Sequence, residues 1–162
     1  MNLIIAFLKN ISFITFAAVW LILNKSYPKE IYVGSYINII HKDWVLYVSL
    51  GFVGVFNLIM IFFLRLLQNI PIEKLNIPNN IFWKENEISK DEFYKVLKAW
   101  FFTFMIAINL YSSFMLYKIW DLNVQNEVRD LSLYWMLGIL IVLIWIIFIS
   151  FRFKIKKYSI WD

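Results

Sequence analysis

Four long apolar segments, separated by polar connections, dominate the pattern of this sequence. They cover about residues 3–23, 44–64, 99–119 and 133–151. Each reaches the roughly 20 residues that an α-helix needs to cross about 30 Å of hydrocarbon. None alternates apolar and polar residues strictly, as the strands of a membrane barrel do. The pattern predicts an all-α, polytopic membrane protein with four transmembrane helices, folded as a single membrane domain over residues 1–162.

The amino-acid composition favours lipid over water as the solvent of the apolar segments. Hydrophobic residues make up 62% of the chain, whereas a soluble domain is closer to half apolar. A domain this small still presents much of its surface to solvent, so lipid accommodates the excess better. The formal net charge of +5 comes from basic residues that flank the apolar segments. Anionic lipid headgroups account for them, and we expect no nucleic-acid partner.

The basic residues are distributed unevenly between the two sides of the membrane. The connections 24–43 and 120–132 together contain four Lys and Arg residues, whereas the middle loop 65–98 and the tail after 151 contain ten. The positive-inside rule assigns the richer side to the cytoplasm. This predicts a cytoplasmic middle loop and cytoplasmic N and C termini. Abundant Ile, Asn, Lys, Phe and Tyr suggest an AT-rich bacterial genome, so we expect a multi-pass protein of the bacterial cytoplasmic (inner) membrane.

The first apolar segment carries one charged residue, Lys9. The segment lacks a basic start and a small-x-small cleavage site, so we expect a retained helix rather than a signal peptide. Lys9 lies about six residues inside, close enough for its long stem to reach back to the headgroups. We expect an interfacial anchor, and the alternative is a functional lysine within the membrane.

One local structure is well specified in the middle loop, where Ser89-Lys90-Asp91-Glu92 reads as a capping box. The Ser89 hydroxyl can accept from the Glu92 amide while the Glu92 carboxylate reaches back. Ile88 and Phe93 occupy the flanking hydrophobic-staple positions. We therefore expect the third helix to begin near Lys90 and to continue unbroken across the membrane.

The middle loop also carries a sequence motif. Asn76-Ile77-Pro78-Asn79, followed by Phe82-Trp83, resembles the N-[LI]-P-N-x-x-[YF]-W signature of an uncharacterised family of small four-span bacterial membrane proteins. The N-terminal domain of that family is shared with SdpI-like immunity proteins, and its layout implies a longer cytoplasmic loop between the second and third spans. The family usually has a P-x-H-[FY]-[ND] element after its first span. Here Ser35 stands about where that histidine would be and His41 is displaced, so no role of the histidine carries over.

Residues for catalysis or metal binding are scarce. The chain has no cysteine, which removes thiolate catalysis and Cys-ligated metal sites. One histidine, His41, together with Asp43 supplies too few ligands for a metal site. The sequence also lacks phosphate-loop, nucleophile-elbow and HExxH motifs. Carboxylates in the middle loop are interleaved with lysines, as on a solvated face. We expect a protein that is not an enzyme and holds no cofactor or metal.

The polar residues at membrane depth are neutral. They are Asn57 in the second span and Asn109, Ser112 and Ser113 in the third. Such residues ordinarily form hydrogen bonds between helices, and we expect that role for Asn57, Asn109 and Ser113. The first two lie at comparable depth, so they are expected to bond to each other. A substrate site is the alternative.

The third span has two distinct faces at 100° per residue. Small and polar residues form one stripe, which we expect to face the bundle: Ala99, Thr103, Ile106, Ala107, Asn109, Leu110 and Ser113. Bulky residues form another sector, which we expect to face lipid or a partner: Trp100, Phe101, Phe104, Ile108, Tyr111 and Met115. The predicted partner face consists of Trp100, Phe104, Tyr111 and, on the fourth span, Trp145.

Three functions fit these features. The first is a non-enzymatic accessory or scaffold subunit of a larger membrane complex, whose partners are the lipid bilayer and other integral membrane proteins. The second is an immunity or signalling protein, which the resemblance to SdpI-like chains implies. The third is a small transporter, which the lack of charge at membrane depth disfavours.

Overall fold

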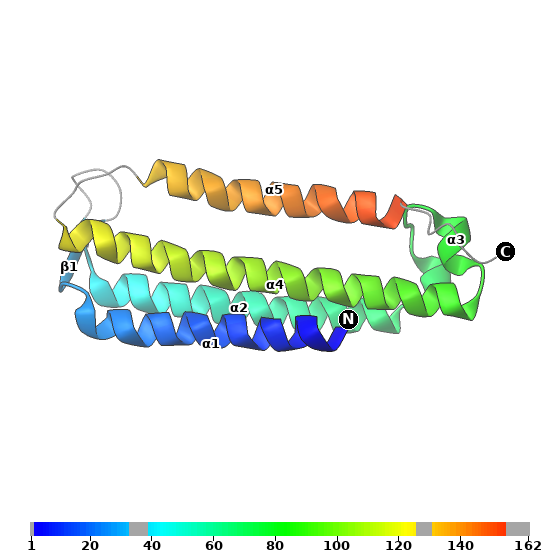
Figure 1. Cartoon of the computed structure of the whole chain (residues 1–162), viewed down its shortest axis with the longest axis horizontal. Helices are drawn as coiled ribbons and strands as arrows, with labels where there is room; N and C mark the ends of the chain where they lie inside the picture. The colour runs from blue at the N-terminus through cyan, green and yellow to red at the C-terminus, as the bar shows by residue number, and fades with distance from the viewer. Residues whose placement is uncertain (1, 33–38, 126–130, 155–162) are drawn as a thin grey trace.

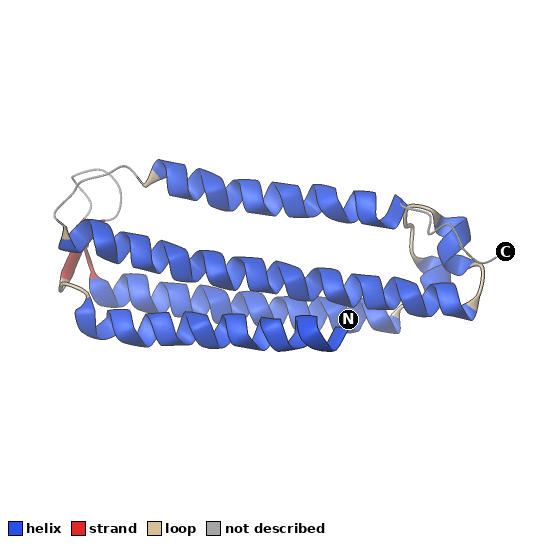
Figure 2. Ribbon diagram, viewed as in Figure 1, coloured by secondary structure: helices blue, strands red, loops and turns tan. Residues whose placement is uncertain are grey.

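The computed structural model describes residues 2–32, 39–125 and 131–154. In these ranges the elements are α1 (Asn2–Ser26), β1 (Glu30–Tyr32), β2 (Ile39–His41), α2 (Lys42–Asn69), the 3-10 turn η1 (Ile72–Lys74), α3 (Asn80–Lys84), α4 (Glu87–Val124) and α5 (Ser132–Lys154). Four helices of this described part, α1, α2, α4 and α5, are long and apolar enough to cross a membrane (Figures 1 and 2). The predicted all-α, four-span fold is confirmed, while the cytoplasmic position of both termini stays a prediction. Ser35 lies outside the described residues.

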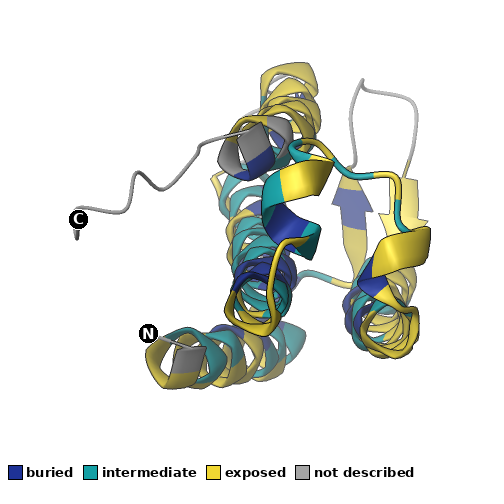
Figure 3. Cartoon of the chain, turned by 90° about the vertical axis from the view of Figure 1, so that its right-hand side faces the viewer, coloured by how far each residue is buried: buried dark blue, intermediate teal, exposed yellow. Residues whose placement is uncertain are grey.

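The four long helices are not packed equally. Helices α1, α2 and α4 lie side by side, whereas α5 runs along the far side of α4 and away from α1 and α2 (Figures 1 and 3). Nearly half of the most apolar stretch of α4 is buried, whereas almost none of the corresponding stretch of α5 is. Helix α4 is therefore the centre of the molecule, and α5 is its most exposed span.

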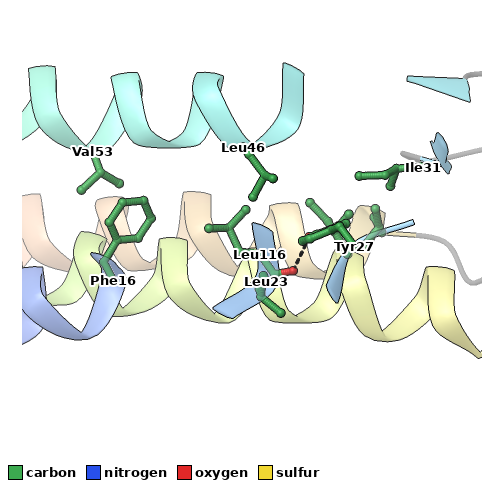
Figure 4. Packing of buried hydrophobic residues seen from close by; sticks show 9 residues of the cluster. Phe16, Leu23, Tyr27, Ile31, Leu46, Val53 and Leu116 are labelled. Atoms are coloured by element: carbon green, nitrogen blue, oxygen red, sulfur yellow. Dashed lines mark hydrogen bonds between the residues drawn. The ribbon is translucent and has the colours of Figure 1, made fainter. Parts of the chain in front are cut away.

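Two apolar clusters, one toward each end of the molecule, hold the helices together. The cluster near the β1–β2 end brings together α1, α2, β1 and α4, and it includes Phe16, Tyr27, Ile31, Leu46, Val53 and Leu116 (Figure 4). The cluster near the α3 end includes Leu64, Ile72, Trp83, Phe93, Phe101 and Phe153. Burial of large apolar side chains at both ends fixes the helices against one another by close packing. Between these clusters lies the buried polar layer described below.

Helix α4 begins at Glu87, three residues before the predicted start, and continues unbroken for 38 residues. At 1.5 Å per residue it is about 57 Å long, far more than the roughly 30 Å of hydrocarbon. Its first turns therefore extend beyond the membrane, as the sequence predicts. They pack against α3 and η1 (Figure 1).

The predicted Ser89–Glu92 capping box is wrong. The N-cap is Asn86, whose backbone is extended and whose Oδ1 accepts from the Ser89 amide at 2.8 Å. Asn and Ser are almost equally good caps, and Asn86 offers the same interaction three residues earlier. Ser89 thus becomes the third residue of the helix. Ile88 is 82% exposed, so the predicted staple between Ile88 and Phe93 is absent as well.

A small antiparallel hairpin, which the sequence analysis did not predict, covers the opposite end of the bundle. Strand β1 pairs with β2 in a register that places Ile31 opposite Ile40. The Asn123 side chain of α4 extends the hairpin, because its Oδ1 accepts from the Tyr32 amide at 2.7 Å and its Nδ2 donates to the Tyr32 carbonyl. Nearby, the buried Tyr27 hydroxyl donates to the Leu116 carbonyl at 2.6 Å (Figure 4), and burial raises its pKa. These bonds tie the hairpin to α4.

Candidate functional site

A buried polar network joins α1, α2 and α4 between the two apolar clusters. Asn57 Nδ2 donates to Asn109 Oδ1 at 2.8 Å, and Asn109 Nδ2 approaches Asn57 Oδ1 at 3.4 Å. Asn109 Nδ2 also donates to Ser12 Oγ at 3.1 Å, which brings α1 into the network. Asn109 is fully buried, and Ser12 and Asn57 are nearly so. The structure thus forms the pairing expected between Asn57 and Asn109.

The donors of this network are used within the protein. The second hydrogen of Asn57 Nδ2 goes to the Val53 carbonyl at 2.8 Å, and the Ser12 hydroxyl donates to the Lys9 carbonyl. Each amide nitrogen therefore has two acceptors, so neither has a hydrogen to spare for a substrate. This arrangement fits a structural link that fixes the relative height of three helices, because unsatisfied polar groups in lipid are costly.

Two residues of the network differ from the sequence interpretation. Ser113 was expected to bond between helices, but its hydroxyl donates to the Asn109 carbonyl one turn back in the same helix. Serine hydroxyls in helices often bond back in this way. Ser12 was missed. The sequence could have indicated that Ser12 is buried, because Ser12 shares a helical stripe with the buried residues Phe16 and Leu23.

The predicted partner face of α4 is wrong, because α5 of the same chain covers it. Trp145 stacks on Phe104 with ring centroids 5.8 Å apart, and Phe104 stacks in turn on Trp100. Trp100 Nε1 donates to the Trp145 carbonyl at 3.4 Å, and the Tyr111 hydroxyl donates to the Tyr134 carbonyl at 2.8 Å. These four residues form the α4–α5 contact rather than a free surface.

The two-face assignment of the third span fails for a geometric reason. A helix at the edge of a bundle has one inner face, but α4 has neighbours on several sides. Phe101, Ile108 and Met115, predicted to face outward, are buried, whereas Leu110 from the small-residue stripe is 46% exposed. Of the small-residue stripe, Asn109 and Ser113 are buried as predicted.

Two apolar grooves flank the α4–α5 contact. The larger, of about 630 Å³, lies between α2, α4 and α5 and is lined by Val48, Phe52, Ile108, Met115, Ile139 and Val142, among others. The second, of about 510 Å³, lies against α4 and α5 and is lined by residues including Leu110, Phe114, Ile141 and Trp145. Tyr111 lines both, and its side chain lies directly against Gly138 of α5. The helices thus touch mainly through aromatic residues and leave open space beside them.

The motif residues of the middle loop lie at the other end of α5. Asn79 has a left-handed backbone (φ 58°) and is the N-cap of α3, which carries the buried Trp83. Trp83 Nε1 donates to the Phe153 carbonyl at 3.2 Å, and its ring packs against those of Phe93 and Phe153. Trp83 therefore fastens the last turn of α5 to the loop. Asn76 and Pro78 are exposed.

Several charged residues of the described part have local roles. His41 is the N-cap of α2, where its Nδ1 accepts from the Asp43 amide at 3.4 Å. Lys90 forms ion pairs with Glu73 and Glu87, and the ammonium beside it holds the pKa of Glu73 below its usual range. Within residues 2–32, 39–125 and 131–154, no group of three His, Asp or Glu side chains is placed to hold a metal ion.

No protein-family model, curated protein or solved structure matches the chain. The chain is a membrane protein with four apolar helices, a closed polar network that joins α1, α2 and α4, and a span, α5, with grooves beside it.

Proposed function

We propose that this protein is a non-enzymatic accessory or scaffold subunit of the bacterial cytoplasmic membrane, which binds another integral membrane protein through α5. The observation that carries the proposal is the exposure of α5. Its segment Ser132–Ile149 is the most apolar of the four spans, with a mean hydropathy of 2.6, yet none of its side chains is buried and only Gly138 is enclosed. A helix that contributes so little to its own bundle is available for contact with another protein.

The attachment of α5 supports this proposal. The aromatic stack of Phe104 and Trp145 holds its middle, and the Trp83–Phe153 contact holds its end. These contacts fix the position of α5 while leaving its flanks open. The 630 Å³ groove beside it is lined by side chains that are almost all apolar, so its occupant has to be apolar as well.

Close packing determines which kind of molecule fits the groove best. In a bilayer, helices associate through close packing rather than through exclusion from water, because lipid chains are as apolar as leucine. An unfilled groove loses the dispersion contacts of its lining atoms. We infer that an apolar transmembrane helix of the partner inserts side chains between α2 and α5. That occupant has a fixed shape, which gives specificity that fluid lipid chains lack.

The test compares two substitutions on α5. Val142→Trp fills the groove from within, whereas Ile147→Trp places the same indole at an exposed position that lines neither groove. After extraction of the tagged protein in mild detergent, Val142→Trp should reduce a co-purifying membrane protein several-fold, and Ile147→Trp should leave it unchanged. A photo-reactive residue at position 142 should cross-link to the same protein.

Several outcomes would overturn this function. The native protein could run as a lone monomer after gentle extraction, or both tryptophan variants could retain the partner equally. A cross-link from position 142 to a second copy of this chain would replace the heteromeric complex with a homo-oligomer. Helical content and thermal midpoint of each variant serve as controls for folding.

A second candidate is an SdpI-like immunity or signalling protein. It is favoured by the motif residues, since Asn79 is the N-cap of α3 and Trp83, within α3, joins the middle loop to α5. Family membership would explain why these residue types stand together. The identity of the co-purified protein separates the two candidates, because a toxin or regulator supports the second and a subunit of a resident membrane complex supports the first.

A further inference from the structure

Two lysines from different helices converge on one aromatic ring. Lys9 of α1 places its Nζ 5.1 Å from the centroid of Phe102, and Lys98 of α4 places its Nζ 5.6 Å from the same centroid. Both lysines and Phe102 are half-buried. Helices α1 and α4 run side by side along this region (Figure 1). The three residues thus lie together where α1 meets α4.

The site lies at a membrane boundary. Lys98 directly precedes the apolar segment 99–119, and Phe102 is one turn further into that segment. Lys9 begins deeper on its own helix, and its side chain extends to the same ring. Long lysine stems reach the headgroup region in this way, so both ammonium groups lie where lipid phosphates are found.

Within the described ranges, no carboxylate forms an ion pair with either lysine. The ion pairs of the described residues involve Lys90, Lys118 and His41, and none of them includes Lys9 or Lys98. The face of the Phe102 ring attracts cations through its quadrupole but carries no net charge. Two like charges held against one ring repel each other, and an anion between them would relieve that repulsion.

We propose that Lys9, Lys98 and Phe102 bind the phosphate of an anionic phospholipid. Basic pockets between transmembrane helices suit such headgroups, because the ammonium groups supply charge and hydrogen bonds at phosphate height. Beyond Lys9, toward the membrane centre, α1 exposes the large apolar side chains of Ile11, Phe13 and Ile14, against which the acyl chains can lie. The proposal commits to a lipid headgroup rather than free phosphate, and it does not depend on the subunit function proposed above.

The experiment measures lipid binding to the full-length protein by native mass spectrometry. The probes are phosphatidylglycerol and phosphatidylcholine of identical acyl chains, titrated into delipidated protein in a neutral detergent. Wild-type protein should bind one phosphatidylglycerol with clear preference over phosphatidylcholine. A lysine near the surface contributes about fivefold to such binding, so Lys9→Gln and Lys98→Gln should each weaken it by about that factor, and the double variant more.

Matched variants make the result specific. Lys95→Gln removes the same charge from an exposed position one turn away on α4 and should leave phosphatidylglycerol binding unchanged. Lys9→Arg with Lys98→Arg keeps both charges and should retain the preference. Equal binding by the Gln double variant and wild type overturns the proposal, as does an equal loss in Lys95→Gln. Displacement of the lipid by millimolar inorganic phosphate would assign the site to free phosphate instead.

Discussion

The side-chain amides of Asn57 and Asn109 face each other across α2 and α4, with Asn57 Nδ2 2.8 Å from Asn109 Oδ1. Each residue lies in the apolar interior of the bundle, and Asn109 has no exposed surface. Because the same amides also bond to Val53 and Ser12, the pair connects three helices at one height. This layer adds to the register that close packing sets, because sliding of one helix would leave buried amides without partners in lipid.

The first prediction tests that layer with a double-mutant cycle. Asn57→Leu and Asn109→Leu should each lower stability in detergent by roughly 1–3 kcal/mol, because each leaves a buried amide without its partner. Asn109→Leu should lower stability more than Asn57→Leu does, since it also removes the hydrogen bond to Ser12. The double change should cost less than the sum of the single changes, as measured by unfolding in a denaturing detergent. Asn10→Leu, at an exposed position of α1, is the control. Strict additivity would show that the two amides act independently.

Local sequence signals explain why part of the fold was predictable. Each span is a contiguous apolar run, and the pairing of Asn57 with Asn109 followed from their depth in two such runs. The hairpin was not predictable, because three-residue strands carry too little pattern and are held by Asn123, which is distant in sequence. The side of α4 that faces α5 could not be predicted, because it depends on how the helices pack and not on the spacing of residues within α4.

The second prediction concerns the start of α4. Asn86→Ala should weaken the first turn by ~1 kcal/mol, because the Ser89 amide loses its acceptor. Ser89→Ala should leave that hydrogen bond intact, since Ser89 contributes only its backbone N–H to the cap. Hydrogen exchange of the amides from Ser89 to Asp91 reports the difference. Faster exchange in Ser89→Ala than in Asn86→Ala would restore the capping box that the sequence favoured.

The third prediction concerns the closest approach of α4 and α5. A Cβ at Gly138 would lie 2.8 Å from Tyr111 Cε1 and nearer still to the phenol oxygen. Gly138→Ala should therefore displace the Tyr111 ring, break its bond to the Tyr134 carbonyl and move α5 outward. Spin labels on the exposed residues Leu110 and Leu140 should report a longer α4–α5 distance.

A matched glycine controls for the substitution itself. A Cβ at Gly54 of α2 has no neighbouring atom within 4 Å, so Gly54→Ala should be neutral or slightly stabilising. An unchanged α4–α5 distance in Gly138→Ala would mean that Tyr111 adapts without moving the helix. The contact would then not set the width of the two grooves.

The last prediction separates the two contributions of Trp83. Trp83→Phe keeps an aromatic ring against Phe93 and Phe153 but removes the donor to the Phe153 carbonyl, so it should cost ~1 kcal/mol. Trp83→Ala removes the ring as well and should lower the free energy of unfolding by ~3–5 kcal/mol. Both should speed amide exchange at the end of α5, because the orphan carbonyls of a helix end lose a partner there. Trp44→Phe, at a position that is 68% exposed, controls for the loss of an indole at the membrane boundary. If exchange near Phe153 is the same in all three variants, α5 is held by the Phe104–Trp145 stack alone and the middle loop does not anchor it.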